Sequence, residues 1–156
     1  MHFFFMRVLV ASAALCLAFA PSVYAQSVNV IQPIRFGTWY ITNNSSQHEV
    51  TVNTDDTSSH SPQLVPVRPP QKGIYQLTGL PISTPVTSIN VTQGQALSGM
   101  GSEVITMNDF QVEADSSTDP SGALALTLGA TARTSGSGFG YGRGMFTGLI
   151  NVEINY

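Results

Sequence analysis

Residues 146–156, Phe-Thr-Gly-Leu-Ile-Asn-Val-Glu-Ile-Asn-Tyr, decide the fold class of this chain. Alternate positions of the segment are apolar or small: Phe146, Gly148, Ile150, Val152, Ile154 and Tyr156. The positions between them are polar, with Leu149 as the exception. Alternation with period two predicts a β-strand with one buried face and one exposed face. Because the chain stops on an aromatic residue of the inward set, we expect Tyr156 to be packed.

Similar segments recur along the chain, separated by stretches rich in Gly, Pro, Ser and Asn. The predicted strands are 27–36, 48–53, 63–67, 73–80, 85–92, 103–113, 122–134 and the terminal segment, with 37–41 continuing the first past a glycine. Residues 54–62 are expected to be a loop and 94–101 a turn-rich connection, and a slip of parity at Asn108 and Asp109 predicts a bulge. Seven or eight short strands without helical periodicity predict an all-β, immunoglobulin-like antiparallel sandwich.

The first 25 residues are predicted to be a secretory signal peptide rather than part of this domain. Arg7 supplies a positive charge, residues 8–20 are apolar, and the segment ends on Ser-Val-Tyr-Ala25, a cleavage pattern of small residues. Either Met1 or Met6 could be the true start, and the lone Cys16 falls inside the apolar run. We therefore expect an exported protein, in the periplasm, at the cell surface or extracellular. Its single domain spans 26–156, without membrane insertion after cleavage.

The composition of residues 26–156 argues against several classes of partner. Without Arg7, five scattered basic residues face nine acidic ones, a net charge of −4. Nucleic-acid binding requires a basic patch, and the sequence offers none. With Cys16 removed, no cysteine is left for a disulfide, so stability must come from a packed core. No cofactor is expected.

Three short motifs, taken in order, resemble a known family. Ile34-Arg-Phe-Gly37 resembles its L-x-F-G motif, and Tyr75-Gln-Leu-Thr-Gly-Leu-Pro81 resembles F-x-V-T-G-x-P. Residues 144–156 resemble the closing G-x-Y-x-G-x-x-x-V-x-V-x-Y. The family is a bacterial secreted domain of unknown function, number 4402, similar to pilin and spore-coat-U-type subunits of chaperone–usher systems. The resemblance implies a non-enzymatic subunit of a fimbria-like or coat-like surface structure. Its implied partners are copies of itself, a periplasmic chaperone and an usher.

The first predicted strand is the candidate for subunit contacts, together with the inward set of the terminal strand. Val28, Val30, Ile34 and Phe36 alternate along it, and extended segments can add to the sheet edge of a neighbour through main-chain hydrogen bonds. About ten residues precede Gly37, enough for one strand of roughly 30 Å and not for two. We therefore predict that this segment pairs within its own sandwich, with the terminal strand as one candidate neighbour. Val30→Asp would then cost several kcal/mol by burying an unpaired charge.

A second hypothesis is a stand-alone carbohydrate- or surface-binding module. Phe139, Tyr141 and Arg143 alternate with glycines in the loop 136–144 and could contact a ligand, with Trp39 and Tyr40 as a further aromatic pair. This loop leads into a strand rather than a helix, so it is not a phosphate-binding loop. A plain loop between strands remains the simpler interpretation.

Catalysis and metal binding are not expected. His48 and His60 are the only histidines after the leader, and no Gly-x-Ser-x-Gly elbow precedes a helix. Asp55-Asp56 and the pair Asp115 and Asp119 are the only carboxylate groupings, and they lack the spacing of an EF-hand calcium loop. We interpret them as solvated loop acids.

Overall fold

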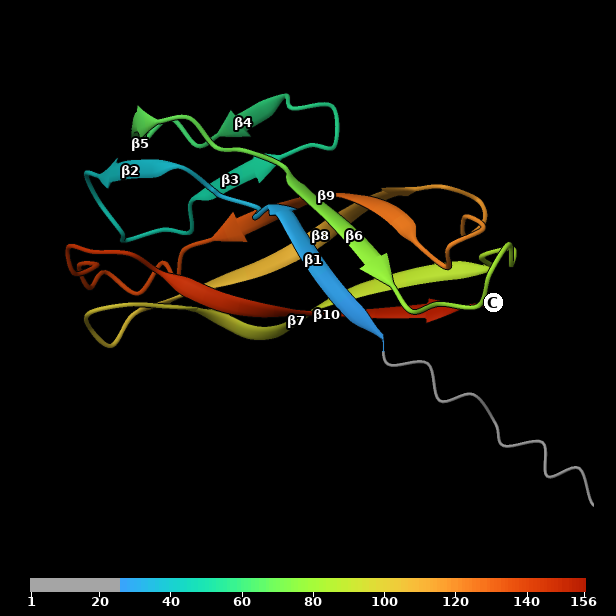
Figure 1. Cartoon of the computed structure of the whole chain (residues 1–156). Helices are drawn as coiled ribbons and strands as arrows, with labels where there is room; N and C mark the ends of the chain where they lie inside the picture. The colour runs from blue at the N-terminus through green and yellow to red at the C-terminus, as the bar shows by residue number, and fades with distance from the viewer. Residues whose placement is uncertain (1–25) are drawn as a thin grey trace, which may run out of the picture.

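The computed structural model describes residues 26–156, so the predicted signal peptide lies outside the described residues. The described part consists of β-strands joined by loops, and it contains no helix (Figure 1). The strands are β1 (Ser27–Gln32), β2 (Thr38–Ile41), β3 (Glu49–Val52), β4 (Ser58–His60), β5 (Leu64–Arg68), β6 (Gly73–Thr78), β7 (Ser88–Ser98), β8 (Val104–Ala114), β9 (Leu124–Arg133) and β10 (Thr147–Asn155). All strand pairs are antiparallel.

The main sheet runs in the order β1-β6-β9-β8-β7-β10 and curls over itself. β8 pairs with β9 along most of its length but meets β7 at two residue pairs, Leu97 with Ile105 and Ser98 with Val104. The long β7–β10 pair therefore leaves the first layer and faces β6 and β9 as a second layer (Figure 1). This arrangement confirms the predicted all-β antiparallel sandwich.

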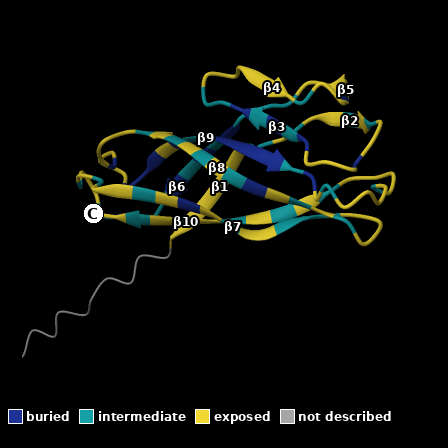
Figure 2. Cartoon of the chain, turned by 180° about the vertical axis from the view of Figure 1, so that it is seen from behind, coloured by how far each residue is buried: buried dark blue, intermediate teal, exposed yellow. Residues whose placement is uncertain are grey.

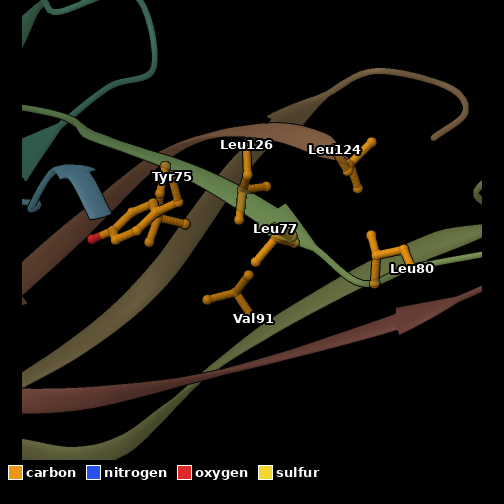
Figure 3. Close-up of a cluster of buried hydrophobic side chains, with 7 residues drawn as sticks. Tyr75, Leu77, Leu80, Val91, Leu124 and Leu126 are labelled. Carbon is orange, nitrogen blue, oxygen red and sulfur yellow. The ribbon is translucent and has the colours of Figure 1, made fainter. Parts of the chain in front are cut away.

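The hydrophobic core lies between these two layers. β9 turns Leu124, Leu126 and Leu128 inward, as their alternation predicts, and they are almost completely buried. The neighbouring members of the cluster, drawn in Figure 3, come from β6, the turn after it and β7: Tyr75, Leu77, Leu80 and Val91. Residues from strands far apart in sequence thus bury one another, which stabilises the sandwich through apolar area removed from water.

β9 serves two neighbours along the same edge. Its first half, from Leu124 to Leu128, pairs with β6, and residues 130–133 pair with β3. Gly129 lies at the junction, where a Cβ atom would be 2.5 Å from the carbonyl oxygen of Val52. Only glycine lets the two backbones approach this closely.

Several boundaries differ from the sequence predictions, and ten strands replace the expected seven or eight. β4, with the sequence Ser-Ser-His, lies in the expected loop 54–62 because it pairs with β3 without needing apolar residues. β2 does not continue β1, since it pairs with β5 in a separate two-stranded ribbon. β7 runs on to Ser98 through Gly94, which makes room for the Asn151 side chain instead of forming a turn. The predicted bulge in β8 is confirmed by a register shift after Asn108.

Candidate functional site

The candidate site is a groove where the two ends of the main sheet approach each other. Within the described chain β1 pairs only with β6 and β10 pairs only with β7, so each strand has one free edge. A groove of about 230 Å³ opens between them. The lining residues come from the start of β1, the end of β6 with the turn after it, and β10: Gln26, Ser27, Val28, Leu77, Thr78, Leu80, Val152 and Ile154. We call this groove, with its two free edges, the seam.

β1 forms one wall of the seam and is poorly covered. Val28 is 57% exposed, Val30 51% and Ile31 62%, so both faces of the strand contact solvent. Figure 2 shows the same exposure on the ribbon. Val30 is therefore not buried, and the expectation that Val30→Asp would bury an unpaired charge is wrong. Alternation identifies which side chains share a face of a strand, but an edge strand buries that face only if another layer extends over it.

β1 pairs with a different strand from the candidate neighbour named from the sequence. The segment pairs within its own sandwich, as predicted, but its neighbour is β6 and not the terminal strand. Its register runs from Ser27 opposite Thr78 to Val30 opposite Tyr75, and a bulge at Ile31 shifts the pairing before Gln32. The hydroxyl oxygens of Ser27 and Thr78 lie 2.7 Å apart and form a hydrogen bond.

β10 forms the other wall. Ile150, Val152 and Ile154 alternate inward and pack against the core while staying partly exposed, which confirms the predicted face of this strand. Tyr156, in contrast, is 44% exposed, so the expectation that it is packed is wrong. Its hydroxyl oxygen accepts a hydrogen bond of 3.3 Å from the Gln26 amide, which links the two walls at one end of the seam.

The remaining predicted contact residues lie outside the seam. Ile34 packs against the core, and its N–H donates to the Tyr75 hydroxyl at 3.1 Å. The Phe36 carbonyl accepts a hydrogen bond from the Trp39 indole N–H, so this residue helps to fix the turn into β2. Phe146 contacts the Tyr141 ring edge-on. Leu77 and Leu80 also line the seam, which their sequence does not predict, because their apolar character indicates a core and not which part of it stays open.

Tyr141 holds the glycine-rich loop 136–144 in place. The Tyr141 hydroxyl accepts from the Ser135 N–H at 2.7 Å and donates to the Val104 carbonyl at 3.2 Å. Phe139 is 70% exposed and Arg143 is also exposed. Of the three candidate ligand-contact residues, Tyr141 is therefore a structural support, while Phe139 and Arg143 remain accessible.

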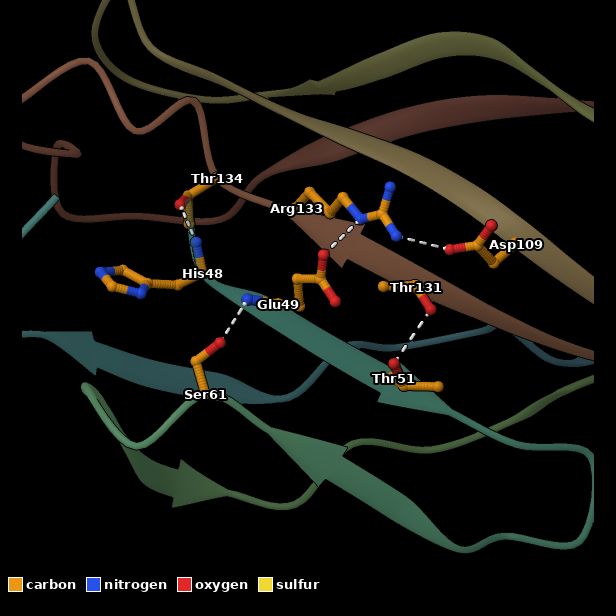
Figure 4. Close-up of polar contacts among 8 residues, drawn as sticks. All are labelled: His48, Glu49, Thr51, Ser61, Asp109, Thr131, Arg133 and Thr134. Carbon is orange, nitrogen blue, oxygen red and sulfur yellow. Dashed lines mark hydrogen bonds and ion pairs between the residues drawn. The ribbon is translucent and has the colours of Figure 1, made fainter. Parts of the chain in front are cut away.

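A polar cluster on the far side of β9 joins three strands (Figure 4). Arg133 forms ion pairs with Glu49 of β3 at 2.7 Å and with Asp109 of β8 at 2.8 Å. The Arg133 Nε atom near Glu49 does not form a hydrogen bond, so this contact is an ion pair only. Next to it, a shallow hollow of about 230 Å³ is lined by polar residues of β3, β4 and Ser61. Its one acid, Glu49, is already engaged by Arg133, which it shares with Asp109.

The candidate catalytic and metal-binding groups remain apart. His48 is buried, with its Nε2 atom 2.7 Å from the Asn43 carbonyl oxygen, while the His60 ring lies 4.8 Å from the Trp39 ring at a tilt of 49°. Within residues 26–156 no group of three or more His, Cys, Asp or Glu side chains could hold a metal ion. The same residues form no helix long and apolar enough to cross a membrane.

Two loop carboxylates organise turns instead. Hydrogen bonds from the hydroxyl and then the N–H of Thr57 lower the pKa of Asp55. The Ser121 hydroxyl, followed by the Ala123 N–H, lowers the pKa of Asp119. In both turns the carboxylate is stabilised in its charged form by donors from its own loop.

The sequence also places the chain in a known protein family. Residues 27–156 match the family described as Domain of unknown function (DUF4402). The chain belongs to this family. No curated protein and no solved structure matches the chain significantly. The DUF4402 domain begins at the first residue of β1 and ends at Tyr156, so both walls of the seam belong to the family's own domain.

Proposed function

We propose that this DUF4402 protein is an exported, non-enzymatic subunit of a bacterial surface structure, either fimbria-like or coat-like. The observation that carries the proposal is the seam, where two free strand edges flank an apolar groove. Monomeric proteins normally protect such edges, because unpaired N–H and C=O groups recruit strands from other chains. A sandwich that leaves both edges open beside its own core is suited to assembly.

The chemistry of the seam defines what it would accept. Main-chain groups of β10 and β1 would pair with an extended segment, and its alternate apolar side chains would cover Val28, Val152 and Ile154. Such strand addition derives affinity from backbone hydrogen bonds and specificity from the side-chain positions in the groove. The candidate partners are copies of this chain, and a periplasmic chaperone and usher during export.

The non-enzymatic part of the proposal is supported by the two histidines. A hydrolytic triad needs a histidine between a nucleophile and an orienting carboxylate. The imidazole rings of His48 and His60 form their described hydrogen bonds with backbone carbonyl oxygens instead. A His48→Ala, His60→Ala double variant is therefore expected to leave any measured activity unchanged.

The direct test is the state of assembly of the protein recovered from its native cells. Unboiled gels and light scattering are expected to reveal a ladder of assemblies that heating in detergent dissolves. Deleting the gene should remove a surface structure visible by electron microscopy. A protein shed only as a soluble monomer, with an unchanged cell surface after deletion, would overturn the proposal.

A second candidate function is glycan or surface binding, and the exposure of Phe139 next to Arg143 favours it. An exposed aromatic ring can stack on a sugar, and Arg143 can donate hydrogen bonds to hydroxyl groups. A glycan array with Phe139→Ala as the control tests this function. Tyr141→Ala is a poor control because Tyr141 supports the loop. Equal signals from the wild type and Phe139→Ala would dismiss this candidate.

A further inference from the structure

We propose that Met100 and Met145 form a reversible oxidation site that switches one end of the sandwich from an apolar to a polar surface. The reagent is a two-electron oxidant of the peroxide or hypochlorous acid class, and the product at each residue is a methionine sulfoxide. The inference goes beyond the proposed function, because it uses neither the seam nor a second copy of the chain.

The first argument is the exposure of the two thioethers. Among the large apolar side chains of residues 26–156, Met145 is the most exposed at 82%, followed by Met100 at 74% and Phe139 at 70%. Oxidation of methionine follows the access of the oxidant to the sulfur atom. After the predicted leader the chain has no cysteine, so thioethers are the only sulfur groups that an oxidant can reach there.

The second argument is that the fold brings the two methionines together. Ser98 of β7 pairs with Thr147 of β10. Met100 and Met145 each lie two residues beyond this pair, at the same end of the sandwich (Figure 1). The Met100 Sδ atom is 3.9 Å from the position that a Cβ atom on Gly144 would take, directly before Met145 in the chain. Glycine at this position leaves the sulfur uncovered, so both thioethers are open on one surface.

The third argument is the contrast with Met107. This methionine is 5% exposed on β8, where it pairs with Ala132 of β9. A sulfoxide oxygen at Met107 would be removed from water without a hydrogen-bond partner, which is costly. At Met100 and Met145 the same oxygen would lie in water. Oxidation of these two residues therefore changes the surface and leaves the core intact.

The oxidant itself balances the chemistry of the switch. The thioether sulfur attacks one oxygen of the peroxide, the O–O bond breaks, an S=O bond forms, and the second oxygen leaves as water. The flexible apolar side chain thereby becomes polar. Methionine sulfoxide reductases reverse the step, because two thiols supply two electrons and two protons, become a disulfide, and the oxygen leaves as water. Apolar surface is therefore removed and restored without a change of fold.

Peptide mapping tests the site. The folded chain is treated with limiting hydrogen peroxide and then cleaved with a protease specific for glutamate. Cleavage after Glu103 and Glu113 places Met100, Met107 and Met145 on three different peptides, so the mass of each peptide reports one of them. We expect Met100 and Met145 to gain oxygen at least about tenfold faster than Met107, which reacts only when the fold opens locally. In urea the three rates should become equal.

The change of surface is measured on a hydrophobic-interaction column. Oxidised wild type should elute earlier than untreated protein at an unchanged melting temperature. A mixture of methionine sulfoxide reductases A and B with a dithiol should restore the original elution. The matched control is the Met100→Leu, Met145→Leu double variant, which keeps this end of the sandwich apolar but offers no thioether there. Its elution should not respond to peroxide.

Three outcomes would overturn the site. Equal oxidation of Met107 in the folded protein would mean that exposure does not select the residue. An unchanged elution of the oxidised wild type, or an equal shift in the double variant, would mean that Met100 and Met145 do not set the character of this surface. A fall in melting temperature on oxidation of these two residues alone would mean that they are packed in solution. Assembly on unboiled gels is a separate readout, so the proposed function can fail while the oxidation site stands.

Discussion

Single residues contribute very unequally to the stability of this sandwich. Leu128 is completely buried between the layers, so truncating it removes apolar contacts and leaves a cavity. Val30 has the same apolar character but lies on an edge strand with half of its surface in water. The difference follows from what covers each strand and not from the side chains.

The first prediction compares these two residues. Leu128→Ala is expected to lower the free energy of unfolding by about 2–5 kcal/mol. Val30→Asp should change it by only about 0.5–1 kcal/mol, because the carboxylate stays in water. Urea unfolding monitored by circular dichroism measures both. A loss for Val30→Asp as large as that for Leu128→Ala would mean that β1 is buried in solution.

The second prediction concerns pH and Asp119. Its pKa is lower in the folded protein because Ser121 and Ala123 donate to the carboxylate. A group with a lowered folded pKa stabilises the protein above its unfolded pKa of about 3.9, and this contribution is lost as the pH falls through the folded value. Asp119→Asn should therefore flatten the decrease in unfolding midpoint below about pH 4. Asp115→Asn, in the same loop, is the charge-matched control. Parallel curves for the wild type and Asp119→Asn would contradict this account.

At the scale of elements, the strands differ in how far their sequences reveal their positions. The alternation from Leu124 to Ala132 predicts β9 correctly, because other strands cover every residue of the apolar parity. The alternation of β1 predicts a strand but not its exposure, since nothing in residues 27–32 indicates that the second layer ends before reaching it. β4 has no apolar residues, so only its partner β3 defines it.

The third prediction concerns the ion pairs of Arg133, which join β9 to β3 and β8. Arg133 bridges Glu49 and Asp109, but all three side chains are partly exposed, so solvent screens their attraction. In a double-mutant cycle of Arg133→Ala and Glu49→Ala, the coupling energy is expected to be about 0.2–1 kcal/mol and to decrease in salt. A coupling of several kcal/mol that persists at high salt would indicate a desolvated pair instead.

At the scale of the whole molecule, the sandwich is closed on one side and open on the other. Between β7 and β8 the layers are joined by strand pairing at the hairpin, and the Gln93 side chain accepts a hydrogen bond from the Met107 N–H. Between β1 and β10, the side-chain contact of Gln26 with Tyr156 joins the walls at one end of an apolar groove. The sequence predicts the class of sandwich from its alternating strands. It does not predict the seam, because a gap between strands depends on sheet curvature and not on any one segment.

The last prediction separates assembly from folding. Val28→Lys places a charge on the exposed wall of the seam, where Val28 is 57% exposed, so the monomer should keep its melting temperature. A lysine on a strand edge opposes the addition of another strand, because pairing would bury the ammonium group against an apolar groove. On unboiled gels, monomer should therefore replace the ladder of assemblies. Val65→Lys is the matched control, since Val65 lies on β5 away from the seam and is 48% exposed. If Val28→Lys assembles like Val65→Lys, subunits must meet at a surface other than the seam.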